Sequence, residues 1–224
     1  RRVLFRSTKP SSIVVIDSHS PVKPPDQLRE KVSWIELPFN ARHSTDHLGR
    51  WSGWTRSVLL AGQFALSVEA DYFVYVEQDC LLAGEGIVEY CISQMSGSIM
   101  LGSGRGTPKP IQQSFFIVRH DRLSGFLTNL AEIKYLDHDC PPEWKFVCAT
   151  SRLLTRLTNL GLLRRKPGRV IAHAIAKLSG LQDLPVGSGR ARPGARGSGG
   201  APDGGVPRRL GPVRLHPSPG GAPP

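Results

Sequence analysis

The sequence predicts an α/β domain with a mainly parallel, twisted sheet and flanking helices, and three observations support this fold class. A short β-branched run, Ser12 to Ile16, ends in a polar segment. Apolar residues at helical spacing begin at Gly53. A second apolar run, Phe73 to Val76, is stopped by the acids Glu77 and Asp79. Strands that are joined through a helix run parallel with a right-handed crossover, so this order indicates a parallel sheet.

The first part of the chain is expected to form two short strands. Ser12 to Ile16 is typical of a buried strand, and it ends at Asp17 in a polar loop. A parallel strand that ends in a loop is where α/β proteins place ligands. Asp26 to Lys31 predicts a short helix, and Val32 to Leu37 alternates as a strand does. Asn40 to Ser52 is polar and is expected to be a loop.

The rest of the domain continues the alternation of helices and strands. The helix that begins at Gly53 is expected to end near Glu69 and Ala70. Further strands are predicted at 98–101 and 114–118, and further helices at 86–94, 122–133 and 143–157, with a last short element at 171–178.

Both ends of the chain differ from the part between them. Residues 1–7 resemble one reading frame of a common sequencing-adapter oligonucleotide, so residues 1–11 are expected to be a scar or disordered and the domain to be incomplete at its N-terminus. The folded domain is placed at residues 12–180. Residues 181–224 form the expected tail, and Pro185 to Pro224 holds 11 glycines and 9 prolines, which predicts disorder. This tail is either an out-of-frame product of a GC-rich gene or a genuine basic tail.

The formal charge of +11 does not indicate a nucleic-acid partner. The six arginines of the tail and its one aspartate carry +5, and Arg1, Arg2 and Arg6 add +3. About +3 remains for residues 8–184, so the folded part is nearly balanced.

Thiol and hydropathy patterns indicate a soluble, cytoplasmic domain. Cys80, Cys91, Cys140 and Cys148 have no metal-type spacing, which predicts reduced, partly buried thiols. No run of about 18 apolar residues predicts a membrane span, and no signal peptide is recognisable. A missing N-terminus would weaken the prediction of location.

Glu77 and Asp79 are the candidate metal ligands. Two carboxylates just past a buried strand reach one point when the loop curls, and a hard divalent cation such as Mn²⁺ or Mg²⁺ prefers such oxygens and takes further ligands from phosphates. Alone, the pair is more typical of solvated acids at a strand end than of a metal site.

The surrounding sequence resembles GT-A glycosyltransferases, particularly glycosyltransferase family two. Arg56, the apolar helix and Ala70 to Asp79 are similar to the segment in which a basic helix start precedes a "gdyvlflDxD" strand. Ile13 to Ser20 resembles the family's "ivvvDdgS" strand, and the resemblance covers about 165 residues. It implies a metal-assisted enzyme that transfers a sugar from a nucleoside-diphosphate sugar to a sugar, lipid or protein acceptor.

The resemblance implies a role for each matching residue. Asp17 matches the aspartate that contacts the nucleotide base, Glu77 the first acid near the ribose or metal, and Asp79 the principal metal ligand. Arg56 falls where a basic residue near the nucleotide is often found, although an arginine on the first turn of a helix is as often structural.

The sequence departs from the family in three respects. The usual first strand has no counterpart before Ser12, and Glu77 replaces the commoner aspartate. The catalytic base, usually in an acidic pair, has the candidates Asp137, Asp139 and Glu143. Glu143, after two prolines, best resembles the "pEw" position, although it could be a helix cap.

Two other functions remain open from the sequence. A sugar-phosphate nucleotidyltransferase shares the architecture but would carry an N-terminal Gly-rich loop. An inactive GT-A-like domain would have only a binding role. The sequence excludes a P-loop NTPase because the loop at Gly102 to Gly106 lacks the required spacing.

Overall fold

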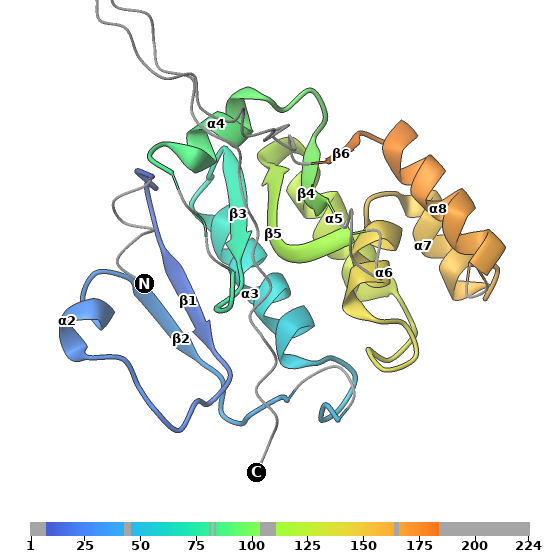
Figure 1. The fold of residues 1–224 in the computed structure, drawn as a ribbon. Coiled ribbons are helices and arrows are strands. Elements are labelled where there is room, and N and C mark those ends of the chain that lie inside the picture. The colour runs from blue at the N-terminus through green and yellow to red at the C-terminus, as the bar shows by residue number, and fades with distance from the viewer. Residues whose placement is uncertain are drawn as a thin grey trace, which may run out of the picture.

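The computed structural model describes residues 8–42, 46–80, 82, 84–103, 111–163 and 166–183. Helices flank mixed sheets in this part of the chain, which confirms the α/β class (Figure 1). The sheets, however, are not uniformly parallel.

The N-terminal strands form a small parallel sheet. β1 (Val14–Asp17) pairs with β2 (Ser33–Glu36), and the short helix α2 (Asp26–Arg29) lies in the connection between them. Asp17 stands opposite Glu36 at the last step of this pairing. The two strands and the helix lie where the sequence predicted them.

The larger sheet has four strands in the order β3-β5-β4-β6. They are β3 (Tyr72–Val76), β4 (Ile99–Ser103), β5 (Ile111–Arg119) and β6 (Leu181–Asp183). β4 and β6 are parallel, but β5 is antiparallel to both of its neighbours. The expectation of a mainly parallel sheet is therefore met only in β1–β2 and β4–β6. Residues 104–110 are too few for a parallel crossover, which needs about a dozen residues or more, so β5 turns back on β4.

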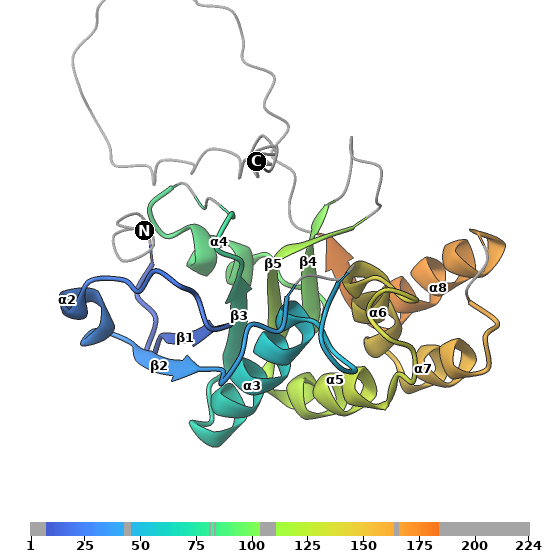
Figure 2. The ribbon, with the colours of Figure 1, turned by 90° about the horizontal axis from the view of Figure 1, so that it is seen from below.

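Helices cover both faces of the four-stranded sheet (Figure 2). α3 (Gly53–Ser67) and α5 (His120–Glu132) lie on one face, and α4 (Ile87–Ser93) lies on the other. The two faces hold separate apolar clusters, one centred on Phe116 and the other on Phe115. Alternate side chains of a strand point to opposite faces, so neighbouring phenylalanines serve the two clusters.

β1 and β3 belong to different sheets, and α3 packs against both of them. Val14 and Ile16 of β1 contact the same apolar cluster as Phe73 of β3. The helix therefore joins the two sheets although no ladder of hydrogen bonds does so among the described strands.

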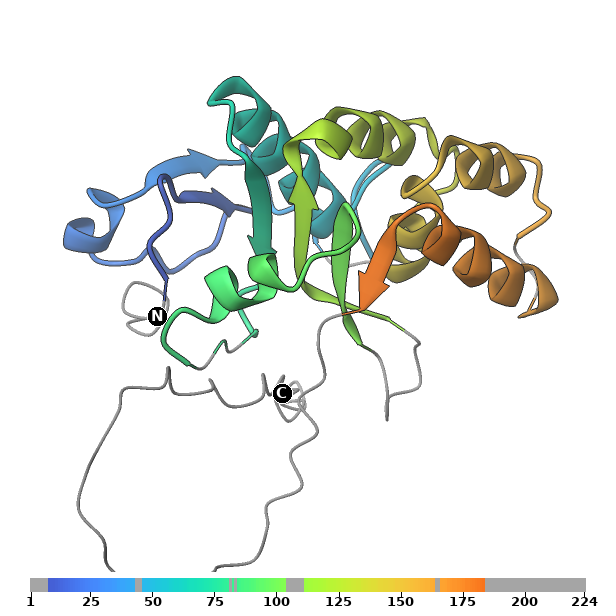
Figure 3. The ribbon, with the colours of Figure 1, turned by 90° about the horizontal axis from the view of Figure 1, so that it is seen from above.

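Three further helices lie beyond the β4 and β6 side of the sheet (Figure 3). They are α6 (Pro142–Ala149), α7 (Arg152–Asn159) and α8 (Lys166–Leu178). The single helix expected at 143–157 is thus two helices, because Ser151 is extended and side chains satisfy the last carbonyls of α6. Thr155 Oγ1 donates to Cys148 O (3.1 Å) and Asn129 Nδ2 donates to Ala149 O (3.0 Å).

Some expectations fall at the limits of the described chain. The domain was expected to end at residue 180, but β6, which was not predicted, extends the described structure to Asp183. α8 is also longer than the element expected at 171–178. Residues 1–7 and 184–224, where the scar and tail were expected, lie outside the described residues. Thr8 Oγ1 and Lys9 N donate to Glu89 Oε1 on α4 (2.6 and 2.8 Å), so residues 8 and 9 contact the domain.

Two other expectations concern thiols and membranes. The four cysteines are free, as predicted. Within the described residues, every helix is too short or too polar to cross a bilayer.

Candidate functional site

Three segments of the chain meet at the first turn of α3. The Cβ position of Gly53 would lie 3.2 Å from Ser18 Oγ, directly after β1. The rings of Trp54 and Tyr75 are 6.2 Å apart, and Ser57 Oγ is 3.2 Å from Tyr75 Oη, near the end of β3. The carboxyl ends of β1 and β3 therefore lie at the same side of the molecule, as expected for a ligand site.

Asp17 sits at the end of β1 and is engaged within the protein. Its Oδ1 accepts a hydrogen bond from Ser20 N (3.0 Å), and its Oδ2 accepts one from Lys23 Nζ (2.6 Å). Burial alone would raise the pKa of Asp17, but the bonds from Lys23 and Ser20 outweigh it and lower the pKa. Lys23 also binds Glu36 Oε1 (2.7 Å), so it links the ends of β1 and β2. A nucleotide base that contacted Asp17 would compete with Lys23.

Glu77 and Asp79 form a tight turn at the end of β3, since Cys80 N donates to Glu77 O (3.1 Å). Glu77 is half-buried, and its Oε2 accepts a hydrogen bond from Ser114 Oγ of β5 (2.7 Å), whereas Asp79 is exposed. Burial, and then the charges of Asp79 and Glu77, raise the pKa of Cys80 to about 11. Both carboxylates are close enough to Cys80 for their charges to favour its protonated thiol.

The acidic turn suits a hard cation that completes its shell from elsewhere. Glu77 is oriented by Ser114, and Asp79 is open to solvent. No group of three or more metal-ligating side chains occurs among the described residues. Two carboxylates are nevertheless a sufficient protein contribution for Mg²⁺, because this ion keeps waters and takes phosphate oxygens. Glu77 and Asp79 are therefore the residues of this turn that could supply oxygen ligands to such a cation.

Arg56 has a structural role that its sequence position did not reveal. Its Nε donates to Trp51 O (2.9 Å) and its Nη2 donates to Leu48 O (3.0 Å), while the guanidinium lies 5.0 Å from the Phe39 ring centre. The side chain thereby holds the loop that precedes α3. These contacts favour the structural interpretation of Arg56 over contact with a nucleotide.

Asp137, one of the three candidate bases, is fully buried. Its Oδ2 accepts hydrogen bonds from Ser52 N (2.6 Å) and Thr55 Oγ1 (2.7 Å), and its Oδ1 pairs with Lys145 of α6. Asp137 caps α3 from another part of the chain, and the charge is neutralised by Lys145. An acceptor hydroxyl could not reach it, so Asp137 is wrong as a candidate base.

Asp139 and Glu143 differ in exposure, and one carboxylate oxygen of Glu143, Oε2, is buried. Asp139 is exposed and lies 3.5 Å from His138 Nε2. Glu143 is half-buried in the first turn of α6, two residues before Lys145. Lys145 and Asp137 attach α6, which carries Glu143, to the start of α3.

Two polar atoms beside the site lack hydrogen-bond partners in the described part of the chain. They are Ser52 Oγ, whose residue is fully buried, and Trp54 Nε1. Buried donors of this kind normally bind water or a ligand. Both groups can donate a hydrogen bond near the contact between Trp54 and Tyr75.

Sequence reasoning missed the roles of Lys145 and Trp54 in this region, and it placed Ser114 on the acceptor side without predicting its contact with Glu77. A signal existed for the first of them, because a lone lysine in the apolar run from Trp144 to Val147 is typical of a buried pair. Ser114 carried no such signal, since its contact with Glu77 depends on the antiparallel register of β5.

Comparisons with models of protein families, with curated proteins and with solved structures found no match for this chain.

Proposed function

We propose that this chain is a metal-assisted glycosyltransferase of the GT-A type that uses a nucleoside-diphosphate sugar. The observation that carries the proposal is the meeting of β1, β3 and the segment 137–145 at the first turn of α3. Asp137 and Lys145 connect the segment that carries Glu143 to the start of α3, and Tyr75, two residues before Glu77, contacts the same turn of α3.

The chemistry of the acidic turn supports a diphosphate ligand. A diphosphate would be repelled by two carboxylates alone, so a divalent cation is needed between them. When bound, the cation neutralises the charge that develops on the leaving diphosphate. Ser114 holds Glu77 Oε2 in place, which reduces the reorganisation that ligand binding requires.

The proposed transfer step uses Glu143 as the general base. An acceptor hydroxyl gives its proton to the Glu143 carboxylate, and its oxygen forms a bond to the anomeric carbon of the donor sugar. The bond between that carbon and the diphosphate oxygen breaks, and the nucleoside diphosphate leaves with the bonding electrons. Glu143 lies at a helix N-terminus, where the dipole favours the charged carboxylate that a base must be before it accepts a proton.

The fold agrees with the proposal at the level of its class, since the described residues form mixed sheets with flanking helices. β1 and β3 are not paired with each other, although α3 packs against both.

Calorimetry of UDP binding with Mn²⁺ and with chelator tests the proposal. We expect UDP to bind at least about tenfold more tightly with the metal, which corresponds to about 1.4 kcal/mol. Asp79→Asn should abolish this gain, because it removes a charge from a site that holds a dication and a diphosphate. Glu77→Gln should weaken the gain less, since one of its oxygens already binds Ser114.

Asp26→Asn is the matched control, because Asp26 is an exposed aspartate on α2 and its loss should leave the metal effect unchanged. Equal UDP affinity with metal and with chelator would reduce the acidic turn to solvated side chains. Metal-dependent binding without sugar transfer would instead favour a binding role alone.

A further inference from the structure

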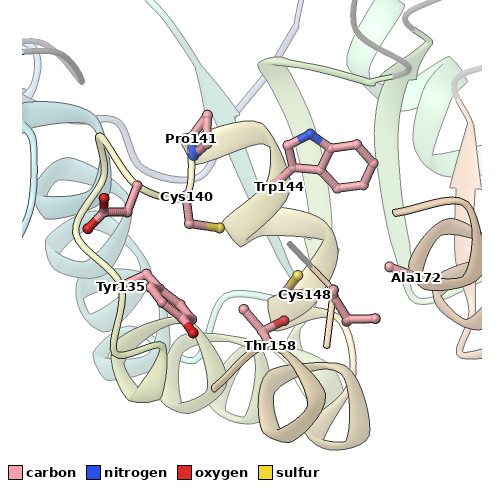
Figure 4. A pocket seen from close by; sticks show the side chains of 9 residues that line it. Tyr135, Cys140, Pro141, Trp144, Cys148, Thr158 and Ala172 are labelled. Atoms are coloured by element: carbon pink, nitrogen blue, oxygen red, sulfur yellow. The ribbon is translucent and has the colours of Figure 1, made fainter. Parts of the chain in front are cut away.

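A concave site lies on the side of α6 that carries Trp144 and Cys148. It is a cavity of about 170 Å³ between α6, α7, α8 and the segment before α6. Figure 4 shows Tyr135, Cys140, Cys148 and Thr158 arranged around its opening. Nothing in the acidic turn contributes to this cavity, so it is a separate site.

The described lining of the cavity mixes polar and apolar side chains and includes no lysine or arginine. Its polar members are the hydroxyls of Tyr135 and Thr158, the thiols of Cys140 and Cys148, and the Asp139 carboxylate. Among these described lining residues, a phosphate or carboxylate ligand would meet Asp139 with no cation to offset the repulsion.

The same lining suits an uncharged ring that carries hydroxyl groups. Trp144, Leu163 and Ala172 provide apolar surface, and the indole of Trp144 provides a flat aromatic one. Asp139 accepts hydrogen bonds from ligand hydroxyls. Thr158 Oγ1 donates to Leu154 O (2.7 Å), which leaves its oxygen available as an acceptor. A few polar groups on an apolar wall are typical of sites for small ligands.

Sequence neighbours of the candidate base line the cavity, although Glu143 itself is not among the lining residues. Pro141 and Trp144 line it on either side of Glu143 in the sequence, and Asp139 lies two residues beyond the buried Asp137. The segment 137–145 therefore connects the cavity with the start of α3. A ligand held in the cavity would be positioned by the same rigid segment that carries Glu143.

We propose that this cavity is the acceptor subsite and that it takes an uncharged, hydroxyl-bearing ring of monosaccharide size. The role as acceptor subsite rests on the proposed function, whereas the chemistry of the ligand rests on the lining alone. The donor diphosphate belongs at the acidic turn, where a cation can bridge it, and the neutral ring belongs in the cavity.

Protection of Cys140 and Cys148 from alkylation measures whether a ligand occupies the cavity. This measurement needs no assay of sugar transfer. Trypsin leaves Cys140 in the peptide 135–145 and Cys148 in the peptide 146–152, so the two thiols are measured separately by mass spectrometry. N-ethylmaleimide is the reagent, and the methyl glycosides of glucose, galactose and N-acetylglucosamine are the probes. Cyclohexanol serves as a ring of similar size that carries a single hydroxyl, and glucose 6-phosphate serves as the ligand that adds charge.

At least one methyl glycoside should slow alkylation of Cys140 about tenfold at about ten times its dissociation constant, because mass action then fills most of the cavities. Alkylation of the peptide that holds Cys80 should not change. Glucose 6-phosphate should protect less than methyl glucoside, and Asp139→Asn should reduce both the protection and this difference. Asp26→Asn should change neither.

Absence of protection by every glycoside would overturn the proposal, and equal protection by cyclohexanol would also do so, since the site would then be merely apolar. Binding of UDP with Mn²⁺ in the same preparation distinguishes this failure from that of the proposed function. Protection without UDP binding would leave a site for a hydroxylated ring and would remove its role as acceptor subsite.

Discussion

Asp137 and Lys145 form an ion pair in which both side chains are fully buried. The pair joins the segment before α6 to α6 itself, and Asp137 also accepts hydrogen bonds from Ser52 N and Thr55 Oγ1 of α3. Taking two charges out of water is costly, so the pair stabilises the fold only while both partners and the α3 donors are present.

Removal of one partner of this ion pair should therefore strongly lower the free energy of unfolding. Lys145→Met leaves the Asp137 carboxylate buried without its counter-charge, and we expect a loss of about 3–5 kcal/mol in the free energy of unfolding. Lys177→Met is the control, because Lys177 and Asp183 form an exposed pair worth at most about 1 kcal/mol. Urea denaturation measures the free energy of unfolding of both variants. Similar losses in the two would show that the buried pair stabilises the fold no more than the surface pair does.

Acid should destabilise the protein through the same carboxylate. Burial alone would raise the pKa of Asp137, but the hydrogen bonds from Lys145 and Ser52 prevail and lower it below that of the unfolded chain. The stabilisation is therefore fully present above the unfolded pKa, which is about 3.9, and is lost as the pH falls through the folded pKa. Thermal melts from pH 6 to 2 should show this loss, and Asp137→Asn should flatten that part of the profile.

The sequence predicted element types better than it predicted partners. Most helices and strands lie where apolar periodicity placed them, because periodicity reports which side of an element is buried. The direction of β5 and the break at Ser151 were not predicted. Both depend on groups distant in sequence, such as Asn129, which binds Ala149 O.

The candidate site shows the same limit. Asp137 and Asp139 are indistinguishable in the sequence, yet one is buried in a network and the other is exposed. Only the approach of Lys145 and the start of α3 separates them, and tertiary packing determines that approach. Arg56 likewise could not be assigned to the loop at 48–51 before its carbonyl partners were known.

Gly62 is expected to be intolerant of substitution. A Cβ added there would lie 2.6 Å from Leu127 Cδ2 and 2.9 Å from Cδ1, where α3 packs on α5. Leu127 is buried and has little room to move, so Gly62→Ala should cost about 1–3 kcal/mol. Gly125→Ala, on α5 with nothing within 4 Å of the new Cβ, should instead gain up to about 1 kcal/mol of helix propensity. A stabilised Gly62→Ala variant would show that the two helices separate easily.

Arg56→Ala should lower the melting temperature more than it changes UDP affinity. The variant loses two hydrogen bonds to the carbonyls of Trp51 and Leu48, each worth about 1–3 kcal/mol because the donor is charged. Arg56→Lys should restore only part of the stability, since an ammonium cannot span both carbonyls as a planar guanidinium does. An unchanged melting temperature with a large loss of UDP affinity would instead indicate that Arg56 contacts the nucleotide.

Glu143→Gln separates catalysis from binding. The substitution keeps the size of the side chain and its place in the first turn of α6 but removes its ability to accept a proton. If Glu143 is the base, UDP release from UDP-sugars in the presence of an acceptor should fall by about 10²–10⁴, which is the usual contribution of general base catalysis. UDP affinity with Mn²⁺ and the melting temperature should stay close to those of the unsubstituted protein. Glu132→Gln, an exposed glutamate at the end of α5, controls for the loss of one negative charge. Equal turnover in both variants would exclude Glu143 as the base and leave Asp139 as the remaining candidate, for which Asp139→Asn should then show the fall in turnover.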